Sequence, residues 1–224
     1  DLTGWDTSSV TSMWKTFQGA HAFNKPLDFN TSSVVSMARM FSDAQLFNQP
    51  VPFDTASVTD MDTMLSSTQA FNQLVVFDTS RVIDMASMFS STLAFNQPLP
   101  FDTSSVTTMY YMFYRAYALN QALAFDTSSV TSMDTMFYEA ASFNKPLTFG
   151  DTSRVTTMSL MFYGTNSLSG CNKRLIHDSL SASTAWAAAG YDWSTLCQPT
   201  ASRARRQARR QARRRARRLP PGRQ

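Results

Sequence analysis

The chain has 224 residues, of which 43% are apolar, and its formal charge of +4 is unevenly distributed. Between Arg203 and Arg223 lie 11 of the 20 Lys and Arg residues, leaving 9 basic against 16 acidic side chains, or a net charge of −7, elsewhere. No apolar run is long enough to span a bilayer. Gly-rich phosphate loops are absent. His21 lies in the first copy of the repeat described below and His177 lies beyond the last copy, so we do not expect them to share a hydrolytic triad or zinc site. We therefore predict a protein with no enzymatic activity and no cofactor.

One segment, with the pattern Asp-Thr-Ser-Ser-Val, recurs along most of the chain. Its copies begin at Asp6, Asn30, Asp54, Asp78, Asp102, Asp126 and Asp151; the interval is constant up to Asp126 and is longer at Asp151 only because Gly150 is inserted. All 13 Met occupy two positions of this repeat and the 17 Phe occupy three. A fixed period of between about 20 and 30 residues, as here, is typical of a solenoid, whose core forms only when repeats stack. Because Asp1 lies inside a repeat, we expect the chain to lack an N-terminal cap.

Within one repeat the apolar spacing predicts two short elements. Val34, Met37, Met40, Phe41 and Ala44 have helical spacing, which predicts a short helix through the Met-Phe-x-x-Ala part. Thr and Val before the first Met favour a short strand instead. The Asp, Thr and Ser residues before it could cap a helix or form an Asx turn, and the sequence leaves both open.

Two polar columns accompany the apolar ones. We predict a structural ladder in which Asn side chains pair with turn backbone groups; its members are Asn24, Asn48, Asn72, Asn96, Asn120 and Asn144. The Asp column could form a calcium ladder, but the Gly-rich spacing of calcium-binding coils is absent, so we favour turn capping. No metal site is predicted.

The segments FNQPL, DTSSVT and MxxMFxxA resemble those of the BspA-type leucine-rich-repeat surface proteins, a mycoplasma lipoprotein-like family of unknown function. The resemblance covers roughly residues 1–169. With the predicted strand and helix, it implies an α/β fold: a leucine-rich-repeat-like right-handed solenoid of about seven repeats, each a short parallel strand plus a short helix. It also implies a location outside the cell or on its surface, and a role in adhesion or partner binding.

After residue 169 the repeat pattern ends, and residues 170–199 are predicted to form a C-terminal cap. Their CNKxxIH and YxWSxLC segments are similar to the ends of eukaryotic members of that family, so we expect a eukaryotic microbial member. Lys173 to Ala182 can form a helix. Cys171 and Cys197 bracket this segment, and we predict a disulfide between them; two free buried thiols are the alternative.

The positions outside the apolar columns are where a partner could bind. We predict a contact patch of Tyr110, Tyr114, Arg115 and Tyr138, because exposed Tyr and Arg favour binding hot spots. The alternative is that Tyr114, Tyr138 and Tyr163 only cover helix ends. The expected partner is an unknown protein or glycan, and the expected state is a monomer.

Residues 200–224 form an Arg-rich tail that we expect to be disordered, with possible contact to RNA, DNA or another polyanion. Polyanion binding by this tail is the alternative function. A third hypothesis is ice or crystal-surface binding by the Thr column that begins at Thr7.

Overall fold

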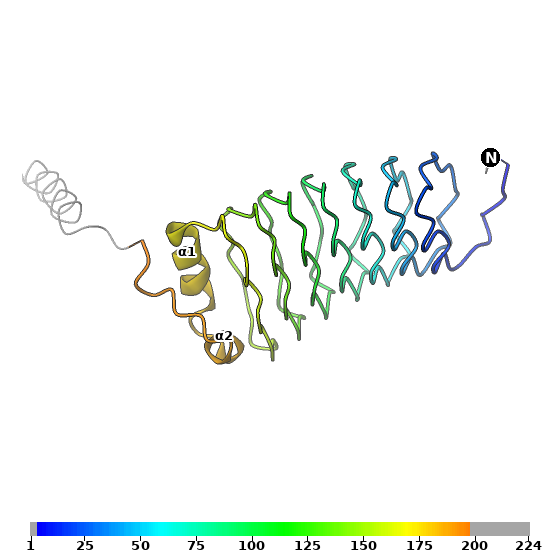
Figure 1. Ribbon diagram of the computed structural model, residues 1–224. Coiled ribbons are helices and arrows are strands. Elements are labelled where there is room, and N and C mark those ends of the chain that lie inside the picture. The colour runs from blue at the N-terminus through cyan, green and yellow to red at the C-terminus, as the bar shows by residue number, and fades with distance from the viewer. Residues whose placement is uncertain (1–3, 198–224) are drawn as a thin grey trace, which may run out of the picture.

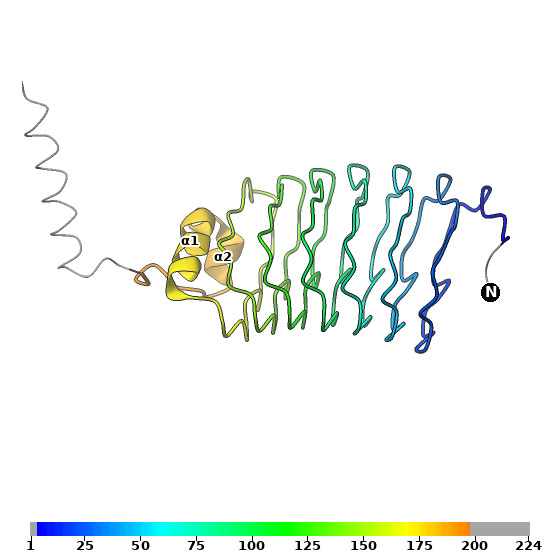
Figure 2. The same cartoon turned by 90° about the horizontal axis from the view of Figure 1, so that it is seen from above.

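The computed structural model describes residues 4–197. Up to residue 169 the chain forms a row of stacked coils, which runs from the N-terminal end to a pair of helices (Figure 1). Seen from above, each coil is a flattened loop lying against the next (Figure 2). Helices α1 (Gly170–Leu180) and α2 (Thr184–Ala188) are the only helices within the described range, and they lie at the far end of the row. Neither is long and apolar enough to cross a membrane.

Each coil is built from consecutive four-residue turns. In the second coil, the Met40 N–H donates to the Met37 carbonyl (3.1 Å) and the Ala44 N–H donates to the Phe41 carbonyl (2.9 Å). The third residues of these turns, Arg39 and Asp43, have φ values of 57° and 61°. A positive φ at the third position is the geometry of a type II turn. It also interrupts the right-handed backbone that a helix requires.

These left-handed residues recur at the same two positions in every coil. The first column contains Lys15, Arg39, Thr63, Ser87, Tyr111, Thr135 and Leu160, and the second contains Gly19, Asp43, Ser67, Ser91, Arg115, Glu139 and Gly164. The predicted Met-Phe-x-x-Ala helix is therefore replaced by turns that place the same apolar residues on the same inner side.

Neighbouring coils are joined by backbone hydrogen bonds at alternate residues. From the second coil, the N–H groups of Met37, Arg39 and Phe41 donate to carbonyls of the third at 3.0, 2.8 and 2.9 Å. Parallel bridges form at one residue per coil along Ser12, Ser36, Asp60, Asp84, Thr108, Ser132 and Thr157. Since these bridges are isolated, no strand forms within residues 4–197. The predicted α/β leucine-rich-repeat-like right-handed solenoid, with a strand and a helix in each repeat, is wrong.

The Gly150 insertion lies between two rungs of the stack. Phe149, just before the insertion, pairs with Phe125 at the ordinary repeat spacing, whereas Thr157, after it, pairs with Ser132 at a spacing longer by the inserted residue. The extra residue is exposed and a Cβ there would meet nothing within 4 Å. The stacking therefore continues past the insertion unchanged.

The core is formed by the Met and Phe columns. All 13 Met side chains are buried, and Phe rings stack between coils, as in Phe17 on Phe41 (5.5 Å) and Phe113 on Phe137 (5.3 Å). Each fully buried side chain of this size contributes about 1.5 to 3 kcal/mol. Rings also pack within a coil, as Phe41 does on Phe47 at 4.2 Å. Because rings in addition stack on their counterparts in adjacent coils, each coil stabilises its neighbours.

The two helices close the last coil. Ser169 caps α1 by accepting from the Asn172 N–H, and Ser183 caps α2 by accepting from the Trp186 N–H. Trp186 is 2% exposed and lies edge-on to Phe162, with 6.3 Å between ring centroids. Its indole N–H donates to Nδ1 of His177 at 3.2 Å. The tail predicted for residues 200–224 lies outside the described residues.

Candidate functional site

The residues predicted to bind a partner lie in the middle of three turns, two in the fifth coil and, for Tyr138, one in the sixth, which is why they face outward. In the fifth coil Tyr110 and Tyr111 are the central residues of the Met109 to Met112 turn, and Tyr114 and Arg115 those of the next turn. Tyr111 and Arg115 have φ values of 59° and 55°. The flanking Met and Phe side chains enter the core, so the central side chains are left on the surface.

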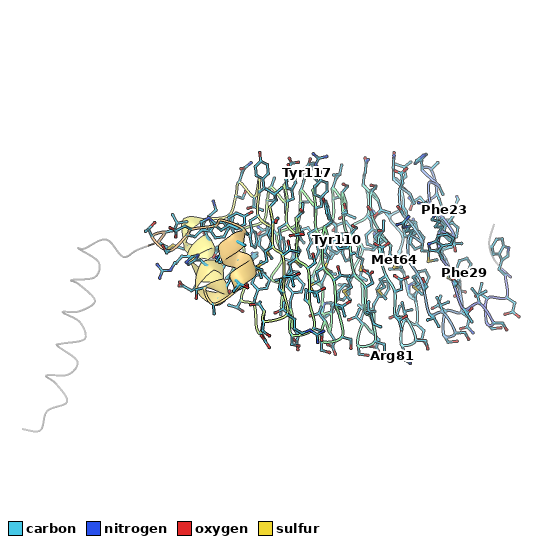
Figure 3. The ribbon with its side chains drawn as sticks, turned by 90° about the horizontal axis from the view of Figure 1, so that it is seen from below. Phe23, Phe29, Met64, Arg81, Tyr110 and Tyr117 are labelled. Carbon is cyan, nitrogen blue, oxygen red and sulfur yellow. A yellow bond between two sulfur atoms is a disulfide. The ribbon has the colours of Figure 1, made fainter. Side chains whose placement is uncertain are left out.

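Tyrosines from three successive coils form a stack there. The Tyr114 ring lies 5.1 Å from Tyr138, and Tyr138 lies 4.9 Å from Tyr163, both nearly parallel. Tyr111 packs against Tyr114 at 5.3 Å and meets Tyr110 edge-on at 5.7 Å. We call this the tyrosine surface; it comprises Tyr110, Tyr111, Tyr114, Arg115, Tyr117, Tyr138 and Tyr163. Tyr117 lies at one edge of the array in Figure 3, and Arg81 at the opposite edge.

An ion pair holds the charged part of this surface. Arg115 Nε donates to Glu139 Oε2 at 2.8 Å, and the guanidinium lies 5.0 Å from the Tyr114 ring centroid. The hydrogen bond to Glu139 raises the pKa of Arg115 above its usual value. Burial raises the pKa of Tyr110 and of Tyr138, so both phenols are neutral at physiological pH.

The structure brings three of the four predicted patch residues, Tyr114, Arg115 and Tyr138, into one cluster. Tyr110 joins them only through Tyr111, which the predicted patch omitted. Glu139 was also missed, although it stands one repeat period after Arg115 and so could have been expected beside it. The alternative, that the tyrosines cover helix ends, does not hold because their coils contain no helix.

A hollow of about 550 Å³ adjoins the tyrosine surface. It is lined by side chains and backbone of Tyr117, Glu139, Ala141, Tyr163, Gly164 and Asn166. This volume lies within the range of about 300 to 1,000 Å³ found for small-molecule sites. None of the lining residues except Glu139 carries a charge.

The Asn column forms a hydrogen-bonded ladder along the stack. Asn48, Asn72, Asn96, Asn120 and Asn144 each donate a backbone N–H, at 2.8 to 3.0 Å, to the side-chain oxygen of the Asn one coil earlier. After the last coil, Ser169 N–H and the Asn172 amide donate to Asn144 Oδ1 at 2.9 and 2.8 Å. Asn172 thus supplies the donor that a Gln supplies between earlier coils, as Gln121 does to Asn96.

A disulfide joins Cys171 and Cys197, whose Cα atoms are 4.7 Å apart. It links the start of α1 to the end of the described chain and encloses both helices. Cys197 has a positive φ of 54°.

The remaining candidates are separated in space or occupied in turns. Asp6 Oδ1 accepts the Ser8 N–H at 3.0 Å, an Asx turn that the Asp column repeats in later coils. Within residues 4–197, no group of three or more His, Cys, Asp or Glu residues is placed to hold a metal ion. His21 contacts Asp43 in the neighbouring coil, whereas His177 lies in α1. The Thr7 column is largely buried, as Thr127 at 0% exposure illustrates, so it is not a surface for ice.

Comparison with known proteins identifies a repeat family. The family model described as "Mycoplasma protein of unknown function, DUF285" matches three times, at residues 1–100, 51–124 and 100–184. Three overlapping matches are expected when the model describes a repeated unit. Searches of curated proteins and of solved structures found no match.

Proposed function

Since the chain belongs to this mycoplasma repeat family of unknown function, we propose that it is a non-enzymatic protein that binds a protein or glycan partner through the tyrosine surface. The observation that carries the proposal is the Tyr stack, half-buried at Tyr114 and Tyr138 and exposed at Tyr163, with its paired Arg115 and Glu139. Exposed Tyr and Arg are enriched at binding hot spots. Stacking fixes the rings before a partner arrives, which reduces the entropic cost of binding.

We further propose a location outside the cell or on its surface, for which the Cys171–Cys197 disulfide is the support. Disulfides persist in oxidising environments and are rare in the cytosol. As part of this proposal, the chain is a BspA-type surface protein of eukaryotic origin with a role in adhesion. We expect the binding unit to be a monomer.

The test replaces Tyr110, Tyr114, Arg115 and Tyr138 together with Ala and measures binding of the full chain to intact host or neighbouring cells by flow cytometry. The control carries Arg81→Ala and Ile83→Ala, which alter an exposed part of the array outside the tyrosine surface. Work at about 0.5 M salt suppresses contacts of the Arg-rich tail. We expect the fourfold variant to lose about 90% or more of binding, since hot-spot residues dominate affinity. Full binding by this variant would reject the tyrosine surface.

A second candidate function is polyanion binding by the tail, favoured by the 11 Arg between Arg203 and Arg223. Binding of this kind weakens steeply with salt, because Arg displaces counterions from phosphates. The full chain should then bind RNA at low salt and lose it between about 50 and 200 mM salt. The fourfold Ala variant should bind RNA as the parent does, which separates this activity from the first.

A further inference from the structure

The hollow beside the tyrosine surface exists because two columns carry small residues at this point. Ala141 stands where the preceding coils have Leu93 and Tyr117, and Gly164 stands where they have Arg115 and Glu139. The carbon chain of Glu139 lies directly over Gly164: a Cβ on that glycine would come within 2.8 Å of Glu139 Cγ. The small residues therefore open the space and let Glu139 line it.

The charges around the hollow favour a neutral ligand. Glu139, the charged lining residue, is bonded to Arg115 at 2.8 Å, so the two side chains together carry no net charge. A cation would have to compete with Arg115 for that carboxylate, and an anion would meet Glu139. Removing a charged ligand from water costs free energy, and the hollow has no unpaired opposite charge that would offset this cost.

The polar groups favour a ligand that both donates and accepts hydrogen bonds. Asn166 is exposed and its side-chain amide offers two donors and an acceptor. The carboxylate of Glu139 adds acceptor capacity beyond the oxygen that Arg115 occupies. Sugar hydroxyls donate and accept in this way.

The aromatic groups favour a ligand with one apolar face. Tyr163 ends the Tyr114, Tyr138, Tyr163 stack, so one ring face packs on Tyr138 while the side chain stays 55% exposed. Tyr117, 40% exposed, also lines the hollow. A pyranose ring combines a C–H face that packs on an aromatic ring with a rim of hydroxyls. Aromatic walls with a few placed polar groups are the usual composition of small-ligand sites.

We propose that this hollow binds one neutral sugar ring of a glycan, with the ring's C–H face on Tyr163 and its hydroxyls on Glu139 and Asn166. The inference rests on the proposed function and names the glycan as the ligand class. Charged sugars, such as sialylated or sulfated units, are disfavoured by the closed ion pair.

The experiment measures binding of the full chain to immobilised glycans, both neutral hexose and N-acetylhexosamine oligomers and sialylated or sulfated ones, at about 0.5 M salt. Ala141→Leu fills the hollow with the residue found at this position two coils earlier, as Leu93, so the coil should still fold. Tyr163→Ala removes the ring face, and Tyr163→Phe keeps it. Ile83→Ala is the control, at an exposed position outside both the hollow and the tyrosine surface.

We expect at least one neutral glycan to bind, with affinity lowered about tenfold or more by Ala141→Leu and Tyr163→Ala but changed less than about threefold by Tyr163→Phe and Ile83→Ala. Binding of no neutral glycan, binding of charged glycans alone, or neutral-glycan binding unaffected by Ala141→Leu would overturn the inference. If cell binding still depends on Tyr114 and Tyr138 after such a result, the proposed function stands and only the sugar site is rejected. If the fourfold Ala variant also binds cells normally, both are rejected.

Discussion

At the scale of single residues, the backbone conformation decides which substitutions a coil tolerates. Two positions per coil have a positive φ, and most are occupied by residues with a side chain, including the β-branched Thr63 and Thr135. An L-residue in this conformation costs about 1 to 2 kcal/mol relative to the right-handed form. The hydrogen bonds between coils must offset this cost, so the turns depend on stacking.

Two glycines allow the free-energy cost of a side chain at positive φ to be separated from the cost of a steric clash. Gly19 and Gly164 occupy the same column with φ of 70° and 72°. A Cβ at Gly19 would meet nothing within 4 Å, whereas one at Gly164 would lie 2.8 Å from Glu139 Cγ and 3.3 Å from its Cα. We expect Gly19→Ala to lower the free energy of unfolding by about 1 kcal/mol and Gly164→Ala by about 2 kcal/mol or more.

Urea denaturation of the two variants checks this difference. Equal losses would mean that Glu139 moves aside at no cost. The Gly164 variant should also weaken the Arg115–Glu139 pair, because the added methyl group displaces the Glu139 side chain.

At the scale of the element, each coil is held by side chains that satisfy backbone groups of the next. Asn96 Oδ1 accepts the Asn120 N–H at 2.8 Å and the Gln121 amide at 3.1 Å in a partly buried position. Asn96→Ala should cost about 1 to 3 kcal/mol, because the Asn120 N–H loses its acceptor away from water.

Asn24→Ala is the matched control for Asn96→Ala. Its rung, at 3.0 Å to the Asn48 N–H, is exposed, and water can replace the lost acceptor. We expect a change within about 0.5 kcal/mol, as for most surface substitutions. Thermal or urea unfolding compares the pair, and a loss at Asn24 as large as at Asn96 would contradict the assignment to burial.

The last coil depends on the cap for the same kind of bond. Tyr191 Oη accepts the Phe162 N–H at 2.9 Å, and burial raises the pKa of Tyr191, which keeps the phenol protonated. Tyr191→Phe should therefore cost about 1 to 3 kcal/mol in unfolding free energy. The control Tyr163→Phe alters an exposed hydroxyl and should have almost no effect. Similar losses of unfolding free energy in both variants would contradict the capping role of Tyr191.

The difference between the predicted and observed coil has a local cause. Burial of the Met and Phe columns was predictable, since a repeat period places equivalent residues in register. The turns were not, because left-handed positions are usually signalled by Gly, and here Lys15, Arg39 and Thr63 occupy them. The outward position of Tyr114 was predictable from the columns around it. The hollow was not, because it depends on the space that Ala141 and Gly164 leave between two coils.

At the scale of the whole molecule, the row of Asx turns makes stability depend on pH. Hydrogen bonds from the Ser two residues later lower the pKa of five Asp; the hydroxyl is the larger cause at Asp6, Asp78 and Asp126, and the backbone N–H at Asp102 and Asp151. A carboxyl whose pKa is lower in the folded state stabilises the protein above its unfolded pKa, and this stability is lost as pH falls through the folded pKa. Asp84 acts in the opposite direction, because burial and the charges of Asp62 and Asp60 raise its pKa.

In the cap, hydrogen bonds from Ser194 also lower the pKa of Asp192. Six carboxyl groups with a lowered pKa against one with a raised pKa predict that the unfolding midpoint falls as pH decreases from about 5 to about 2. Asp102→Asn tests the cause, because Asn keeps the side-chain acceptor but does not titrate, and Asn30 already occupies this column and accepts the Ser32 N–H. The variant should fold normally and should lose less stability than the parent between neutral and acid pH. Melting curves recorded across this range decide the matter: parallel pH dependence in parent and variant would mean that Asp102 does not contribute, and acid unfolding would then have to originate elsewhere in the stack.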